Sequence, residues 1–433
     1  MQVDPRQVDD QSVQARIWAE RDWVPLAQAI VEKSCPVFGL DQKGTGRLTM
    51  AVEEVLMHLA RTAKNTEIRL DIQPGGWYVA ARLSFYADPS ELWAMNLTAV
   101  PMKGDTPDLD HLGLVLASRM TDRFDLTVEG GRVQLTLRRD LPYPTVTAEP
   151  RPRIVPKGPL TIVFDPDPDL VKAACIRALG LYRPEQLHHS FFKPGKLADM
   201  VARGDMAMAV ALTKTLEPAG MVCWQGNSGI TFFGPYAFDQ ARESAKLLIN
   251  HLIQRVARTG AKGMFSGLAT QELPPGDFES LGTYGPGSKT TETRVWYRHL
   301  GEDPGTSVWS HPDLIPFLEK TYPPLWLMRQ IRPTQDLGER HPERSVLSAR
   351  LRPEISEALL VPLVGGRDMA GCLADHVAAL QAEGLDRILF QTDLSSGWQA
   401  ALGRAALDAG FTPKLVLPYG GKSDILVFQY ERV

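Results

Sequence analysis

The chain has 433 residues, of which 44% are hydrophobic and 23% charged, so it can form several domains with buried cores. Its net charge of −4 argues against a general nucleic-acid-binding surface. No apolar run approaches the ~18 residues of a membrane span, and the polar, acidic beginning is unlike a secretory signal. The four cysteines lack the spacing of zinc or redox motifs. We therefore expect a cytoplasmic protein that binds neither nucleic acid nor membranes.

Two turn-rich stretches divide the chain into three segments. Residues 141–157 hold many prolines and little apolar periodicity, and residues 332–344 are charged and rich in turn residues. We predict that these stretches are linkers between domains at residues 1–140, 158–331 and 345–433.

In the first segment, predicted helices alternate with antiparallel strands. Apolar residues recur at helical spacing over residues 23–39 and 48–61, and a third helix is expected over residues 108–126. Hairpins are predicted at residues 67–85, around Pro-Gly-Gly, and at residues 126–141, around Glu-Gly-Gly. This order indicates an α+β sandwich with helices over one face of a sheet.

The second segment predicts strands, a hairpin and two helices. In chain order these are strands at 160–164 and 206–212, a hairpin at 218–238, a helix at 240–260, a strand at 262–269, and a helix at 311–331 that breaks at Pro323-Pro324.

The third segment repeats part of that order in a smaller form. It predicts two strands at 345–365, a helix and a strand at 368–394, and a helix followed by two strands at 397–433. The shared order of hairpin, helix ending in glycine, and strand suggests two related subdomains.

The first segment resembles a known ATPase fold. Three stretches carry the likeness: "LTMAVEEVLMHLAR" (48–61), "LSFYADPSEL" (83–92) and "DHLGLVLASRMTDRFDLTVEGGRVQLTLRR" (110–139). They resemble the anti-sigma-factor serine-kinase branch of the histidine-kinase-like (GHKL) ATPases. The resemblance implies a GHKL-type α/β sandwich with an ATP and magnesium site.

The nucleotide-binding residues implied by this resemblance are Glu54, His58, Asp88 and Gly113. Glu54 matches the glutamate that would orient water or an attacking hydroxyl. His58 replaces a magnesium-binding Asn and offers only nitrogen, which is a poor magnesium ligand. Asp88 matches a Phe-Asp-Pro position, but the adenine-reading Asp-x-Gly is absent, and Gly113 alone remains of the lid glycines. We expect hydrolysis and kinase activity to be lost, with retained nucleotide binding as the alternative.

The later segments resemble the GNAT acyltransferase superfamily, 158–331 clearly and 345–433 more faintly. The likeness lies in the hairpin, the strand "GITFFGPYAF", the long helix after it and the strand "MFSGLAT". The resemblance implies mixed α/β domains and an acetyl-CoA site at the start of the long helix, where backbone N–H groups hold pyrophosphate. The implied acyl-CoA-binding residues are Phe238, Gln240, Arg242, Ser244 and Ala245. Glu243 stands where the family has its first glycine, and its carboxylate would repel phosphate.

Catalytic residues stay unassigned. An acyltransferase needs a general base and often a late acid, and four residues qualify by type alone: Glu217, Tyr236, His251 and Tyr284. His188 and His189 are adjacent, so they point in different directions, and no third ligand is near in the sequence. We therefore predict no metal site.

The order of the segments resembles a bacterial protein type in which an anti-sigma-like domain precedes GNAT-like modules. In both the nucleotide site and the acyl-CoA site, residues that would lie next to the phosphate groups differ from the family pattern. We therefore predict a pseudoenzyme: a regulatory or adaptor protein that binds a protein partner. A homodimer is an option, since the run "PPLWLM" (323–328) is either an interface or, as we favour, the end of a helix packed between domains. The alternatives are an acyl-CoA-dependent N-acyltransferase with a regulatory ATP-binding-like domain, and an anti-sigma-type serine kinase.

Overall fold

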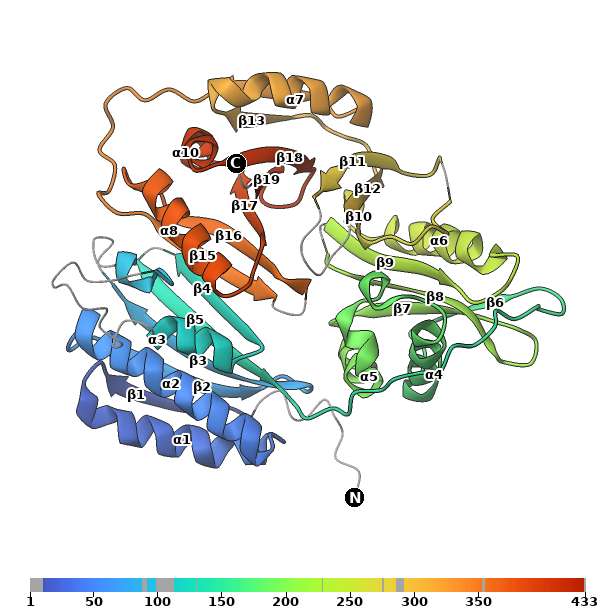
Figure 1. Cartoon of the computed structure of the whole chain (residues 1–433), viewed down its shortest axis with the longest axis horizontal. Coiled ribbons are helices and arrows are strands. Elements are labelled where there is room, and N and C mark those ends of the chain that lie inside the picture. The colour runs from blue at the N-terminus through green and yellow to red at the C-terminus, as the bar shows by residue number, and fades with distance from the viewer. Residues whose placement is uncertain are drawn as a thin grey trace.

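The computed structural model describes residues 11–87, 92–98, 113–129, 131–227, 229–274, 276–285, 292–352 and 355–431. Three α/β units follow one another along the chain, each built around one main sheet (Figure 1). A small two-stranded sheet comes between the second and third units. None of the helices in the described ranges is both long and apolar enough to cross a lipid bilayer. That residues 1–140, 158–331 and 345–433 fold as independent domains stays a prediction.

The first unit is a two-layer sandwich, as its sequence predicts. Its antiparallel sheet has the order β1-β2-β3-β5-β4, and three helices cover one face (Figure 1). The strands are β1 (Val13–Trp18), β2 (Glu67–Pro74), β3 (Tyr78–Tyr86), β4 (Arg123–Glu129) and β5 (Arg132–Asp140), and the helices are α1 (Val24–Val37), α2 (Gln42–Thr62) and α3 (Gly113–Met120).

Helix α2 shows why this layer forms. Leu48, Val52, Val55 and Leu59 recur at helical spacing and are fully buried over the sheet. The carboxylate of Asp41 caps the helix by accepting the N–H of Gly44 at 2.6 Å.

Two features of the first unit differ from the sequence analysis. Strand β1 was not predicted, and the helix expected over residues 108–126 already ends at Met120. From Arg123 onward, alternate residues are buried, which is the period of a strand, so this stretch joins the sheet as β4.

The second unit is a seven-stranded sheet of order β11-β12-β10-β9-β8-β7-β6. Only β9 and β10 are parallel, and α6 connects them. The strands are β6 (Thr161–Phe164), β7 (Ala207–Leu212), β8 (Pro218–Gln225), β9 (Gly229–Ala237), β10 (Gly263–Leu268), β11 (Glu279–Tyr284) and β12 (Thr293–His299), and the helices are α4 (Pro168–Leu179), α5 (Pro194–Arg203) and α6 (Glu243–Val256). Helices α4 and α5 and strands β11 and β12 were not predicted.

Both faces of this sheet are covered. Met221 and Cys223 of β8 belong to the core shared with α4 and α5, whereas Val222 and Trp224 belong to the core under α6. The near-continuous apolar run of β8 is therefore the pattern of a strand buried on two sides.

A small extension carries the run "PPLWLM". It consists of β13 (Thr306–Ser310), α7 (Ile315–Thr321) and β14 (Arg329–Pro333), with β13 and β14 parallel. The helix ends before Pro323-Pro324, where the sequence predicts a break, but the chain after the prolines forms strand β14, so the prediction of helix up to residue 331 is wrong. Leu325 and Leu327 are buried, whereas Trp326 is 85% and Met328 72% exposed. The role that we favoured for this run, packing between domains, therefore fits the two buried leucines and not the two exposed side chains.

The third unit has the order β15-β16-β17-β19-β18 and contains the strands that its sequence predicts, whereas the single helix predicted after residue 397 forms as two short helices. Its strands are β15 (Val346–Arg352), β16 (Glu357–Val364), β17 (Arg387–Asp393), β18 (Phe411–Leu417) and β19 (Ile425–Tyr430), and its helices are α8 (Met369–Ala382), α9 (Gly397–Ala401) and α10 (Gly403–Asp408).

The predicted internal repeat is visible in the strand pairing. The orders β8-β9-β10-β12-β11 and β15-β16-β17-β19-β18 have the same succession of antiparallel and parallel pairs, and α6 and α8 hold equivalent places. The repeats meet at equivalent edge strands, β11 and β18 (Figure 1). A Cβ at Gly282 would lie 2.6 Å from the carbonyl oxygen of Lys414, so the close approach requires glycine.

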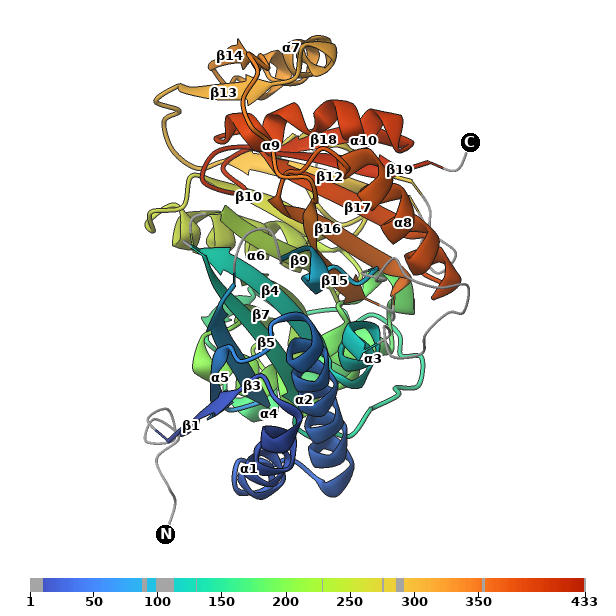
Figure 2. The same cartoon turned by 90° about the vertical axis from the view of Figure 1, so that its left-hand side faces the viewer.

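The first and third units share a seam. Strand β4 lies beside β15 in both views (Figures 1 and 2), and Arg350 pairs with Asp125 at 3.2 Å. The side chain of Asn96 donates to the carbonyl of Ser345 and accepts the N–H of Leu347, both at 2.8 Å. These contacts cover sheet edges that would otherwise be open.

A buried ion network fixes the extension to the third unit. The side chain of Arg329 is fully buried, and its Nε donates to Asp424 at 2.7 Å. Its Nη1 lies 2.9 Å from both carboxylate oxygens of Asp303, to which the hydroxyl of Tyr419 also donates. The guanidinium of Arg329 thus pairs with two buried carboxylates.

We expect Arg329→Met to lower the free energy of unfolding by about 3–5 kcal/mol, because both carboxylates lose their cation. Urea unfolding followed by tryptophan fluorescence measures this change. The control is Arg332→Met, an exposed arginine on the same strand, which should change stability little. A loss below about 1 kcal/mol, the value of a surface ion pair, would contradict the network's role.

His376 introduces a pH dependence at the seam between the first and third units. Its Nδ1 lies 2.8 Å from the carbonyl of Cys372 and 3.3 Å from the hydroxyl of Thr98, while Nε2 has no hydrogen-bond partner among the described residues. Burial lowers the pKa of His376 below its ordinary value. The unfolded state therefore binds a proton near pH 6.5 that the folded state does not.

It follows that stability should fall as the pH drops below about 6.5. In His376→Gln, the difference in unfolding free energy between about pH 7.5 and about pH 5.5 should shrink relative to the wild type. An unchanged difference in His376→Gln would refute the assignment.

Candidate functional site

The residues predicted to bind a nucleotide are only partly within the described chain. Glu54 is half-buried and His58 is buried, both on α2, and both make contacts within the protein. Gly113 begins α3, whereas Asp88 lies outside the described residues. The GHKL-type site therefore stays a prediction.

The residues predicted to bind acyl-CoA gather where β9 and β10 separate. The two strands pair from Gly229 and Gly263 up to Phe233 and Leu268, and then part before Pro235, which has no N–H for a ladder. The chain passes from β9 through a tight turn into α6. Around this turn Phe238, Ser244 and Ala245 are buried, while Gln240 and Arg242 are exposed.

A buried aspartate occupies the start of α6. The carboxylate of Asp239 accepts the N–H of Glu243 at 2.8 Å, the N–H of Ser244 at 3.4 Å, and the hydroxyl of Ser244. Asp239 itself is fully buried, and Arg242 takes a left-handed conformation (φ 58°) that tightens the turn. The positive end of the helix thus already holds an internal anion.

The sequence analysis missed Asp239, although a usable pattern was present. Aspartate is a preferred capping residue, and this one comes just before the predicted helix.

The predicted linker lies against the same turn. Ile154 donates its N–H to the carbonyl of Phe238 at 2.8 Å, and its carbonyl accepts the N–H of Gln240 at 2.9 Å. The N–H of Arg242 donates to the carbonyl of Asp239 at 3.3 Å. Residues 141–157 are therefore more than a spacer, because Ile154 pairs with the backbone of the candidate site.

The free edge of β9 also has internal partners. The hydroxyl of Tyr182 donates to the carbonyl of Ala237 at 2.9 Å and accepts its N–H at 2.7 Å. Arg153 donates to the same carbonyl, and the hydroxyl of Thr270 donates to the carbonyl of Pro235. An extended ligand lying along this edge would have to displace these groups.

Glu272 completes the cluster and was also missed from the sequence. Its side chain is 4% exposed and accepts from Nη2 of Arg153 at 2.8 Å, and Nε of Arg242 lies 3.9 Å away. Burial lowers the pKa of Arg153, but Tyr182 and Glu272 outweigh burial and raise it above the ordinary value. Burial, with Glu272, also raises the pKa of Tyr182. Tyr182 is therefore protonated near neutral pH, where it can donate a hydrogen bond but cannot act as a base.

The four candidate catalytic residues come from different elements. Glu217 is exposed between β7 and β8, and the buried hydroxyl of Tyr236 donates to the carbonyl of Gln186 at 2.9 Å. On α6, Nδ1 of His251 lies 2.9 Å from the carbonyl of Leu247, and Tyr284 ends β11. Within the described residues no hydrogen bond, ion pair or ring contact joins any two of them, so the structure adds no support for a catalytic assignment.

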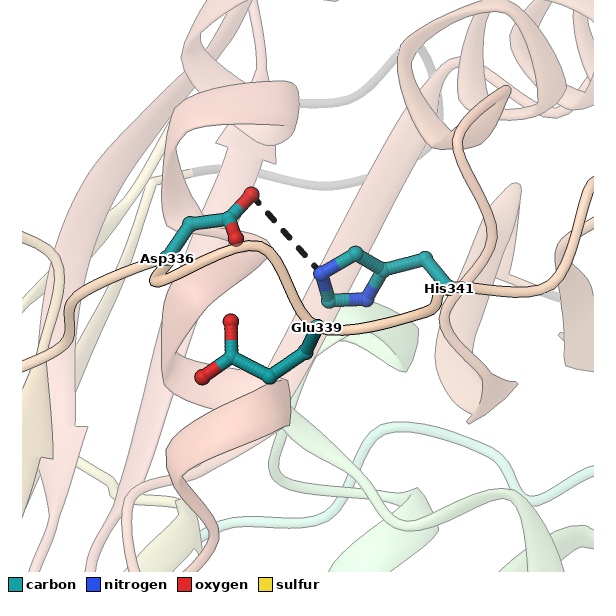
Figure 3. A group of neighbouring side chains, drawn as sticks. All are labelled: Asp336, Glu339 and His341. Atoms are coloured by element: carbon teal, nitrogen blue, oxygen red, sulfur yellow. Dashed lines mark ion pairs between the residues drawn. The ribbon is translucent and has the colours of Figure 1, made fainter.

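The adjacent histidines make local contacts: Nδ1 of His188 lies 2.6 Å from the hydroxyl of Ser190, and its ring packs beside Phe233. A different group, Asp336, Glu339 and His341, brings its ligand atoms within 4.8 Å of one another in an exposed turn (Figure 3). Asp336 and His341 lie 3.8 Å apart, and each carboxylate accepts a backbone N–H of the same turn. These contacts describe a hydrogen-bonded turn, and we assign no metal to it.

A groove of about 1110 Å³ lies in the extension, away from the candidate site. It is lined by residues of β13, α7 and β14 and by the exposed Trp326 and Met328.

The sequence matches no known protein-family model and no curated protein. About a third of the chain is similar in fold to solved acetyltransferases. A GNAT acetyltransferase from Staphylococcus aureus is 12% identical, with 33% of this chain and 100% of that chain covered and a TM-score of 0.25. A probable GNAT acetyltransferase from Chromobacterium violaceum is 18% identical (35% and 97% covered, TM-score 0.26). PaiA N-acetyltransferase from Thermoplasma acidophilum, solved with coenzyme A, is 11% identical (33% and 99% covered, TM-score 0.26).

We expect Asp239→Ala to lower the free energy of unfolding by about 2 kcal/mol, because a buried cap with three hydrogen bonds is lost. Asp239→Asn keeps an acceptor and should cost less. Asp167 caps α4 from an exposed position, so Asp167→Ala is the matched control and should show a smaller loss. Equal losses in the two alanine variants, measured by urea unfolding, would mean that the burial of Asp239 adds nothing.

Proposed function

We propose that this chain is a regulatory or adaptor protein that acts by binding another protein, with an acyltransferase-like unit that transfers no acyl group. The position of Asp239 carries this proposal. An acetyl-CoA bound as the resemblance implies would rest its pyrophosphate on the amides at the start of α6, and the carboxylate of Asp239 accepts two of those amides. Two anions cannot share them, so cofactor binding would first have to expel a buried carboxylate.

The surroundings of Asp239 support the same proposal. The side chain of Glu243 adds a second carboxylate at the first position of α6. Ile154 takes the amide of Gln240, and Tyr182, Arg153 and Thr270 bind the free edge of β9. The groups that could hold a phosphate or an extended acyl carrier are thus mostly engaged within the protein.

The exposed groove in the extension supports binding to a protein. Large apolar side chains exposed beside a groove are typical of interaction surfaces. Trp326 and Met328 have this position, next to strand β14.

An acyl-CoA-dependent N-acyltransferase is the second candidate, and one observation favours it. The parallel pair β9 and β10 still separates beside the start of α6, where Arg242 is exposed. The amide of Ala241 has no acceptor among the described residues. A ligand using Arg242 and this amide would leave Asp239 in place.

Titration calorimetry and thermal shift with the full chain and acetyl-CoA separate the two candidates. At about 1 mM acetyl-CoA, a dissociation constant near 10 μM would stabilise the protein by about 2.7 kcal/mol. We expect no such stabilisation of the wild type, and weak binding to emerge in Asp239→Asn, because the repelling charge is gone. Asp167→Asn, at the cap of α4, is the control and should bind nothing.

Tight binding by the wild type that Arg242→Ala abolishes would reject the non-catalytic proposal and favour the acyltransferase.

A further inference from the structure

The segment that joins the first and second units lies along the second unit. From the end of β5 it runs past α5 and α4 toward β6 (Figure 1). Val146 donates its N–H to the carbonyl of Phe192 at 2.8 Å, and further on Arg151 donates its N–H to the carbonyl of Gly180 at 3.1 Å. We call residues 149–156, the part of this segment that reaches the start of α6, the strap.

The strap binds the second unit through its main chain, as a short added strand would. Ile154 donates its N–H to the carbonyl of Phe238 and accepts the N–H of Gln240, which is the pattern of a parallel bridge. A Cβ at Gly180 would lie 2.7 Å from the carbonyl oxygen of Glu149, so glycine is needed for the close passage of the strap. Extended peptides that add to the edge of a sheet use main-chain bonds of the same kind.

One side chain of the strap has a specific set of partners. The guanidinium of Arg153 donates to the carbonyl of Ala237 and, at 2.8 Å, to the carboxylate of Glu272. It also lies 5.4 Å from the centre of the Tyr182 ring, a cation–π distance. Glu272 is 4% exposed and Arg242 lies at the edge of ion-pair range, 3.9 Å away, so Arg153 is the closer cation of a buried carboxylate. This position therefore favours arginine.

Little of the strap is buried. None of residues 149–156 is buried, and only Arg153, Ile154 and Pro156 are half-buried. A segment with so few buried side chains opens at a low cost in free energy. Its three prolines favour an extended main chain in the free state as well, so little conformational entropy is lost when it binds. The strap thus has the properties of a detachable ligand.

We propose that the strap is an internal ligand, and that an extended, arginine-containing segment of a protein partner binds the second unit in its place. The partner's arginine would pair with Glu272 as Arg153 does, and its main chain would take over the bonds of Ile154. The inference rests on the proposed function, because it names the kind of segment that the adaptor protein recognises. A tethered segment competes at an effective concentration on the order of 1 mM, so the strap also limits binding to partners that outcompete it.

The test is fluorescence anisotropy of a labelled synthetic peptide of residues 148–157, titrated with the full chain. The double substitution Arg153→Ala and Ile154→Pro releases the strap and leaves Glu272 unchanged. We expect this released variant to bind the peptide, and the wild type to bind it at least about tenfold more weakly, because its own strap competes. A peptide with Arg153→Ala should bind the released variant about tenfold more weakly or worse, since charge-assisted hydrogen bonds are lost.

A peptide with Arg151→Ala is the matched control, because it loses the same charge from an exposed position and should keep its affinity. Three results would overturn the inference: the released variant does not bind at about 1 mM peptide, the effective concentration of the strap; the wild type binds as tightly as the released variant; or the two altered peptides bind equally.

Thermal unfolding without peptide checks that the released variant is folded, and if it is not, Arg153→Ala alone takes its place with the same expectation. The acetyl-CoA titration of the wild type does not involve the peptide, so the proposed function and this inference fail by different results.

Discussion

The hydrogen bonds from the first amides of α6 to the carboxylate of Asp239 are the interaction on which this reading of the molecule depends. A helix N-terminus attracts one anion, and the origin of that anion decides what the helix can do. When it belongs to a ligand, the turn is a binding site. Here it belongs to the chain, and the turn is a structural cap surrounded by Ile154, Arg153 and Tyr182. A turn and helix of this kind can therefore either bind a ligand or only stabilise the fold.

Elsewhere in the structure, sheet edges and buried charges are also covered or paired by other parts of the same chain. The second and third units repeat one strand order and meet at the equivalent strands β11 and β18. In the third unit, β15 is an edge strand and lies beside β4 of the first unit, so two sheet edges protect each other. Arg329 adds a fully buried cation between the extension and the third unit. The three units thus depend on one another for covering edges and balancing charge.

Periodicity in the sequence was enough to predict much of the fold. The helix at α2 and the hairpins around Pro-Gly-Gly and Glu-Gly-Gly follow from apolar spacing and turn residues, and so does the repeat of hairpin, helix and strand. Strand β14 was predicted as helix, because "LWLMRQI" has no period that distinguishes the two states and its pairing with β13 is set by tertiary contacts. Within the candidate site, Asp239 could have been found as a cap. Arg153, Tyr182 and Glu272 could not, because they lie 86, 57 and 33 residues from Asp239, counted along the sequence, and only the fold brings them to β9.

The most direct measurement of the central claim is a crystal structure of the full chain grown with saturating coenzyme A. We expect the carboxylate of Asp239 on the amides of Glu243 and Ser244, with no phosphate density there. A pyrophosphate bound to those amides, with Asp239 turned away, would contradict it.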